Sequence, residues 1–177
     1  MALNGLLLAG VIVIAIIFAF SSVGDHWYFL FKWIHVTFAV IWIGGGVLLT
    51  ILGFKAQQSG DSAEIVTIAR QAAFAGEKLF APAGLIVFLM GIAMMINTDW
   101  GWGTFWIDAG LVGYAATFIT GIGVLSPLAK QIQTLAKEKG PEAPETIAVI
   151  NKILLIARVD VAVLLLVIAD MVTKPFS

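Results

Sequence analysis

Long apolar runs separated by short polar segments dominate the chain. A transmembrane helix needs about 20 apolar residues. Runs of this kind cover residues about 4–22, 27–54, 77–97, 105–128 and 145–173. The first run has no basic segment before it and is too long for the core of a signal peptide, so we expect it to be retained. The pattern predicts an all-α, polytopic membrane protein, a bundle of five transmembrane helices.

Two polar segments interrupt this pattern between the later runs. Residues about 61–75 repeat apolar positions at helical spacing, and Asp61 or Ser62 can cap their first turn. We therefore expect a short amphipathic helix before the third span. Residues 129–145 are polar and contain Gly140 among several helix breakers, which predicts a loop.

Composition supports the membrane class and excludes several functions. The chain is 60% hydrophobic and 12% charged, against about 25% charged in soluble domains. No polar segment is long enough for a separate soluble domain, so residues 1–177 form one transmembrane domain. A net charge of −1 argues against nucleic acid as a partner. The chain has no cysteine, which excludes disulfides and thiolate metal sites.

Basic residues are distributed unevenly between the two ends of the predicted spans. Lys32 and Lys174 lie on one side, with five aromatic residues. The other side holds seven basic residues: Lys55, Arg70, Lys78, Lys130, Lys137, Lys139 and Lys152. The aromatic residues are Trp27, Tyr28, Trp100, Trp102 and Trp106, as in an interfacial belt. The positive-inside rule then predicts a cytoplasmic N-terminus and an outer C-terminus.

Charged residues within or beside the predicted spans form a candidate polar network. Its members are Glu77, Asp108, Arg158, Asp160 and Asp170. Arg158 and Asp160 point about 200° apart on one helix, so each needs another partner, and Glu77 is the acid expected for Arg158. Such charges either clamp helices together or line a transport pathway.

His35 is the most distinctive polar residue inside a span. Trp42, Gly45 and Gly46 share its helix face. In one interpretation His35 hydrogen-bonds a neighbouring helix and the glycines allow close packing. In the other, His35 is an axial ligand of haem iron and the ring lies along the glycines. His26 points the opposite way, so the sixth ligand would be a methionine, water or His35 of a second subunit.

Two segments carry a resemblance to known membrane proteins. Residues 32–46 (KWIHVTFAVIWIGGG) hold a W-x-H followed by W-x-G-G, and residues 158–175 begin RVD and end ADMVTKP. Together they resemble a family of predicted integral membrane proteins of unknown function, related in pattern to copper-resistance D proteins and membrane-embedded haem-binding protoporphyrinogen oxidases. The resemblance implies a bacterial cytoplasmic membrane and haem b at His35. The oxidases also use a lysine in a later helix, where residues 105–110 contain none.

Three functions follow as hypotheses. The first is binding of haem or a related tetrapyrrole through His35, for membrane redox chemistry. The second is transport of a small ion or solute by the intramembrane charges. The third is a non-catalytic accessory or assembly subunit. The lipid bilayer is the expected partner in all three, with a homo-oligomer or a larger membrane complex as the assembly.

Overall fold

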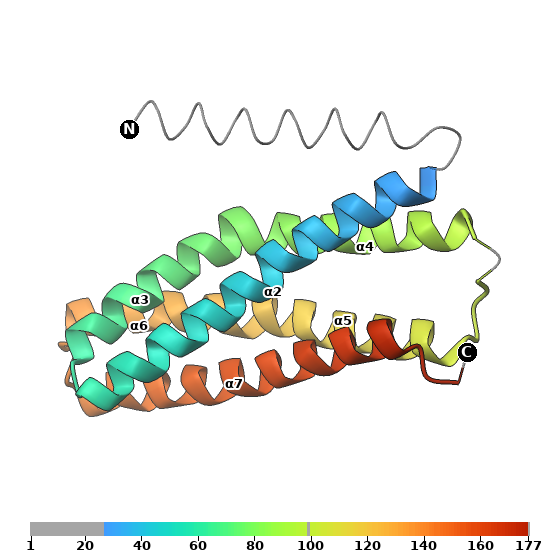
Figure 1. Cartoon of the computed structure of the whole chain (residues 1–177). Coiled ribbons are helices and arrows are strands. Elements are labelled where there is room, and N and C mark those ends of the chain that lie inside the picture. The colour runs from blue at the N-terminus through green and yellow to red at the C-terminus, as the bar shows by residue number, and fades with distance from the viewer. Residues whose placement is uncertain (1–26, 99, 177) are drawn as a thin grey trace.

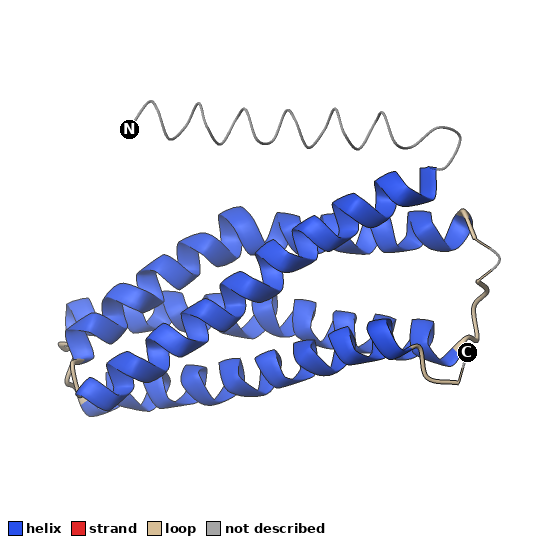
Figure 2. Ribbon diagram, in the orientation of Figure 1, coloured by secondary structure: helices blue, strands red, loops and turns tan. Residues whose placement is uncertain are grey.

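The computed structural model describes residues 27–98 and 100–176, and within them it contains helices and no strand. The described residues form four long helical rods, which lie side by side and are joined by short loops (Figures 1 and 2). Two rods are single α-helices, α2 (Trp27–Ser59) and α7 (Pro144–Thr173). The other two are each built of three elements without a break: α3 (Ser62–Ala75), η1 (Gly76–Phe80) and α4 (Ala81–Ile96), then α5 (Phe105–Thr120), η2 (Gly121–Leu125) and α6 (Ser126–Glu138).

The continuous rods correct two of the predicted boundaries. The amphipathic helix at about 61–75 and the span at about 77–97 are one rod, and the span predicted at about 105–128 continues to Glu138. The predicted loop at 129–145 therefore shrinks to residues 139–143. The N-cap prediction is confirmed, because the Asp61 carboxylate accepts hydrogen bonds from the backbone N–H groups that begin α3.

Each of these two rods contains a π turn just before a proline. Inside an α-helix proline lacks the N–H for the i→i−4 bond, and its ring collides with that carbonyl. Both π turns end two residues before a proline, in GEKLFAP before Pro82 and GIGVLSP before Pro127. An extra residue in the preceding turn lets the helix continue, at the expense of a bend. Figure 1 shows the rod changing direction between α3 and α4.

Three helices among the described residues are long and apolar enough to cross a membrane: Trp27–Ser59, Ser62–Ile96 and Phe105–Glu138. The prediction of five is therefore not supported. The predicted span at about 4–22 lies outside the described residues. The fifth predicted span, α7, contains Arg158, Asp160 and Asp170 within its apolar stretch. These three charges make it more polar than the helices that could cross a membrane.

The rods are longer than a membrane requires. At 1.5 Å per residue the 33 residues of α2 span about 50 Å, against about 30 Å for the hydrocarbon core. We define the basic end as the end with the α2–α3 and α6–α7 connections (left in Figure 1). A conventional apolar core fills this end, formed by Ala56, Ile65, Ala69, Ile132, Ile150 and Leu154.

The opposite, aromatic end contains the start of α2, the α4–α5 loop and the end of α7 (right in Figure 1). Here α5 packs on α7 through Gly110 and Gly113, where a Cβ atom would collide with Met171 and Val167 respectively. Small residues at this spacing allow the two helices to approach closely. Gly121 begins a π turn instead, with no atom of the described residues within 4 Å of the position of a Cβ.

Candidate functional site

His35 lies on α2 and faces α4. Its Nδ1 is 2.7 Å from the carbonyl oxygen of Val87, and its ring lies against Gly91, which has no Cβ to hold it away. A carbonyl can only accept, so Nδ1 carries the proton and Nε2 is left with a lone pair. Among the described residues Nε2 has no hydrogen-bond partner. The half-buried imidazole is thus fixed in orientation and presents one nitrogen to a ligand.

Trp42 lies two turns further along α2, in a cluster of aromatic rings. Its ring meets those of Tyr114 and Phe118 edge to face, with centroids 5.6 and 6.0 Å away. Tyr114 also stacks on Phe88 and donates a hydrogen bond to the carbonyl oxygen of Gly84 at 3.1 Å. We call Trp42, Phe88, Tyr114 and Phe118 the aromatic cluster. It joins α2, α4 and α5, and sequence reasoning missed Tyr114 because nothing in its local pattern shows which helix it meets.

The two predicted glycines face different surroundings. The ring of Phe80 lies directly against Gly45, so closely that a Cβ there would collide with it. Gly46 faces an internal cavity. A planar tetrapyrrole laid along these glycines would compete with Phe80 and with the ring partners of Trp42. His35 thus offers a ligand atom, whereas the residues along the glycine face do not fit haem.

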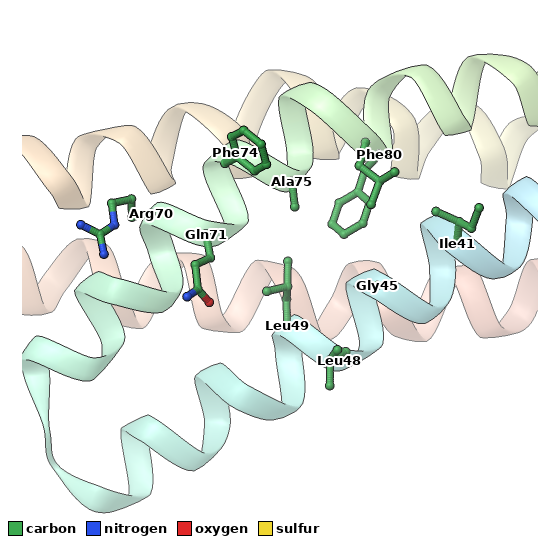
Figure 3. Close-up of a pocket in the computed structure, with 10 residues that line it drawn as sticks. Ile41, Gly45, Leu48, Leu49, Arg70, Gln71, Phe74, Ala75 and Phe80 are labelled. Atoms are coloured by element: carbon green, nitrogen blue, oxygen red, sulfur yellow. The ribbon is translucent and has the colours of Figure 1, made fainter. Parts of the chain in front are cut away.

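An open groove of about 600 Å³ lies on the far side of Phe80, between α2 and the α3–α4 rod (Figure 3). Its lining is apolar apart from Arg70 and Gln71, which lie together toward the basic end. Leu49 and Phe80 line both this groove and the internal cavity. These two side chains form the wall between the two spaces.

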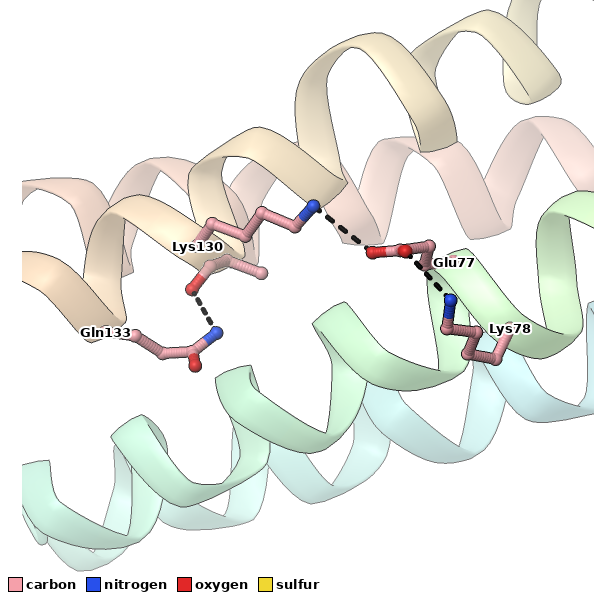
Figure 4. A network of polar contacts seen from close by, with 5 residues as sticks. Glu77, Lys78, Lys130 and Gln133 are labelled. Atoms are coloured by element: carbon pink, nitrogen blue, oxygen red, sulfur yellow. Dashed lines mark hydrogen bonds and ion pairs between the residues drawn. The ribbon is translucent and has the colours of Figure 1, made fainter.

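Glu77 lies on the exposed surface of η1. Its carboxylate accepts from Lys78 at 3.1 Å and from Lys130 of α6 at 3.2 Å (Figure 4). The expected pairing of Glu77 with Arg158 is therefore wrong. Glu77 instead joins the two rods that contain π turns, and its two lysines leave it no need of a further cation.

Arg158 instead clamps α7 to α2. Its guanidinium donates to the Gln57 side-chain oxygen at 2.6 Å and lies over the Phe54 ring, 5.0 Å from the centroid. The Gln57 amide in turn donates to Asn151 at 3.2 Å. Arg158 is therefore an inter-helix clamp, as in one of its interpretations, but its partner is the neutral side chain of Gln57. Asp160 does not take part and lines the internal cavity.

The two remaining acids lie at the aromatic end. Asp108 is exposed in the first turn of α5. One carboxylate oxygen of Asp170 is buried without a hydrogen-bond partner in the described part of the chain. The Lys174 ammonium lies over the rings of Trp100 and Trp106, 4.0 and 5.0 Å from their centroids, rather than on Asp170.

The five predicted network residues thus occupy separate places. Within residues 27–98 and 100–176 no hydrogen bond or ion pair joins any two of Glu77, Asp108, Arg158, Asp160 and Asp170. The same residues contain no group of three or more histidine or acidic side chains placed to hold a metal ion. His35 therefore lies on a helix that could cross a membrane, and Asp160 lies beside a cavity.

Comparison with known proteins identifies one family. The model of a family described as "Predicted integral membrane protein (DUF2269)" matches residues 29–175. No curated protein matches the chain. No solved structure matches it either.

Proposed function

The chain belongs to the DUF2269 family of predicted integral membrane proteins, and from this premise we propose that it binds haem b or a related tetrapyrrole through His35, for membrane redox chemistry. The observation that carries the proposal is the 2.7 Å hydrogen bond from His35 Nδ1 to the Val87 carbonyl. Metal-ligating histidines usually donate their other ring N–H to a carbonyl or carboxylate, which fixes the tautomer and makes the ligating nitrogen more basic. His35 has this arrangement inside a membrane helix.

His35 is the residue that would hold the iron, and the bound group would supply one-electron redox chemistry. The rest of the chain acts by orientation. Val87 fixes the imidazole plane, and Gly91 lets the ring approach the α4 backbone. The resemblance of residues 32–46 to haem-binding membrane oxidases points to the same histidine. The side of α2 at Gly45 is left out, because Phe80 fills it.

The optical spectrum of the full chain tests this proposal. Protein purified in mild detergent from haem-replete cells is expected to show a Soret band that shifts on reduction with dithionite. His35→Ala should abolish the band, whereas His26→Ala, which removes the only other histidine, should keep it. A wild-type spectrum without a Soret band, or one unchanged in His35→Ala, refutes haem ligation and favours an accessory subunit without a ligand of its own.

We further propose that the basic end faces the cytoplasm of a bacterial cell, in the cytoplasmic membrane. The described rods gather the α2–α3 and α6–α7 connections, with their lysines, at that end (Figure 1), as the positive-inside rule requires. The C-terminus is then outside, and the predicted span at 4–22 would return the N-terminus to the cytoplasm. A homo-oligomer or a larger membrane complex is the assembly proposed with this topology.

A further inference from the structure

An internal cavity of about 140 Å³, still partly open to the surface, lies beside the two π turns. Its walls come from every rod and are mostly glycine, alanine and branched aliphatic side chains. Three polar side chains line it: Thr50 of α2, Ser126 of α6 and Asp160 of α7. Ser126 Oγ lies so close to Gly76 that a Cβ there would come within 2.9 Å of it. The absence of a side chain at Gly76 therefore lets η1 and the start of α6 approach each other and enclose the space.

Asp160 is the one charged residue in this lining. Its carboxylate has no hydrogen bond or ion pair among the described residues. Arg158, on the same helix, is held by Gln57 of α2. Lys78 and Lys130 of the neighbouring rods are held by Glu77 on the outer surface. An isolated carboxylate in an apolar space is costly unless a proton neutralises it or a cation accompanies it.

The size and oxygen content of the cavity limit what that positive charge can be. A water needs about 10–15 Å³ of space for its centre, so the cavity has room for several waters or for a small hydrated ion. Ser126 Oγ has no hydrogen-bond partner among the described residues, and Thr50 Oγ1 donates to the Gly46 carbonyl at 2.9 Å and can still accept. The cavity is too small for a tetrapyrrole or a lipid.

We propose that this cavity binds one small hydrated monovalent cation, with Asp160 as its counter-charge and the Ser126 and Thr50 hydroxyls as further oxygen ligands. The ligand class is a single positive charge, supplied as Na⁺, as K⁺ or as a proton that binds to the Asp160 carboxylate itself. A single carboxylate matches one charge, which argues against a divalent ion. The inference does not depend on haem, because His35 and the cavity are separate and share no residue.

Thermal unfolding of the full chain in lipid nanodiscs tests the proposal. Wild type and Asp160→Asn are compared in choline chloride, NaCl and KCl of equal ionic strength, and in choline chloride over a range of pH. A ligand that binds only the folded state raises its unfolding midpoint. We expect Na⁺, K⁺ or acidification to raise the midpoint of wild type by more than that of Asp160→Asn, and the condition that does so identifies the ion.

Two further variants keep the test decisive. Asp108→Asn removes an exposed carboxylate outside the cavity and should respond as wild type does. Ser126→Ala keeps the charge and removes one oxygen, so it should need several-fold more of the same cation for half of the effect. Equal responses of wild type and Asp160→Asn to all three ions overturn the proposal. If Asp160→Asn does not fold, an unchanged half-effect concentration in Ser126→Ala overturns it.

Discussion

Gly84→Ala tests whether the aromatic cluster is as tightly packed as the structure indicates. A Cβ at Gly84 would lie 2.8 Å from both Cδ2 and Cε2 of Phe118 and 3.6 Å from Trp42. Phe118 cannot easily move away, because it stacks on Tyr114 and meets Trp42 edge to face. The added methyl group therefore forces α4 away from α5.

The expected magnitude comes from two opposing effects. Overpacking of a rigid core costs about 1–3 kcal/mol, while alanine stabilises a helix interior by about 0.5–1 kcal/mol relative to glycine. Gly44→Ala is the matched control, since no atom of the described residues lies within 4 Å of its added Cβ. It keeps the helix gain without the collision. Subtracting the two variants cancels the helix term and leaves an expected gap of about 1–3 kcal/mol.

Reversible unfolding in mixed micelles, followed by far-ultraviolet circular dichroism, measures this gap directly. Gly84→Ala should unfold at lower denaturant than wild type or at nearly the same concentration, and Gly44→Ala at the same concentration or higher. Trp42 fluorescence should change in Gly84→Ala alone, because its ring lies beside the displaced Phe118. A gap between the two variants below about 0.5 kcal/mol, within the error of such comparisons, would show that the cluster yields and that this account of its packing is wrong.

Three further predictions concern the basic end. Ile132→Ala should destabilise the fold by about 2–5 kcal/mol in the same unfolding assay, because Ile132 is fully buried, whereas Ile119→Ala, at a side chain 66% exposed, should have a much smaller effect. Arg158→Met should lower stability by about 1 kcal/mol through loss of its bond to α2; an unchanged unfolding midpoint would contradict the clamp. The hydrogen bond from Lys139 holds the pKa of Glu145 below its usual range. This pair therefore stabilises the fold at pH values above the unfolded-state pKa, and the stabilisation is lost as the pH falls through the lower folded-state pKa. Glu145→Gln should flatten the acid side of the plot of stability against pH, and a plot identical to that of wild type would refute the pairing.

The elements that depend on local pattern were predictable from sequence. Asp61 caps α3 because a short carboxylate just before an amphipathic run can accept hydrogen bonds from the first backbone N–H groups of the helix. Gly110 and Gly113 meet α7 because small residues one turn apart let helices approach. His35 bonds to a neighbouring helix, as one of the two interpretations of that residue required. Each of these follows from the residue and its immediate neighbours along the chain.

The polar partners were not predictable, because charge alone does not select them. Glu77 was the obvious acid for Arg158, yet two lysines lie nearer to it once α6 continues the rod. Arg158 then meets the neutral side chain of Gln57. No local signal places Gln57 beside α7, because the contact depends on the tilt of α2 across the bundle. The contact of the Phe80 ring with Gly45 also depends on tertiary packing, so the sequence did not predict it.

The prolines connect the error in the predicted boundaries to the proposed cation site. Pro82 and Pro127 lie inside continuous rods, although proline opposes helix continuation. In the structure each proline is preceded by a π turn, which begins at a glycine six positions earlier. Tertiary packing at the basic end keeps both rods helical, so the geometric mismatch appears as a wider turn. The first π turn meets the start of α6 at Gly76 and Ser126, and the space between these rods is the cavity that Asp160 lines. π turns are rare and occur frequently at functional sites. The presence of two π turns beside one unpaired carboxylate therefore supports the proposed cation site.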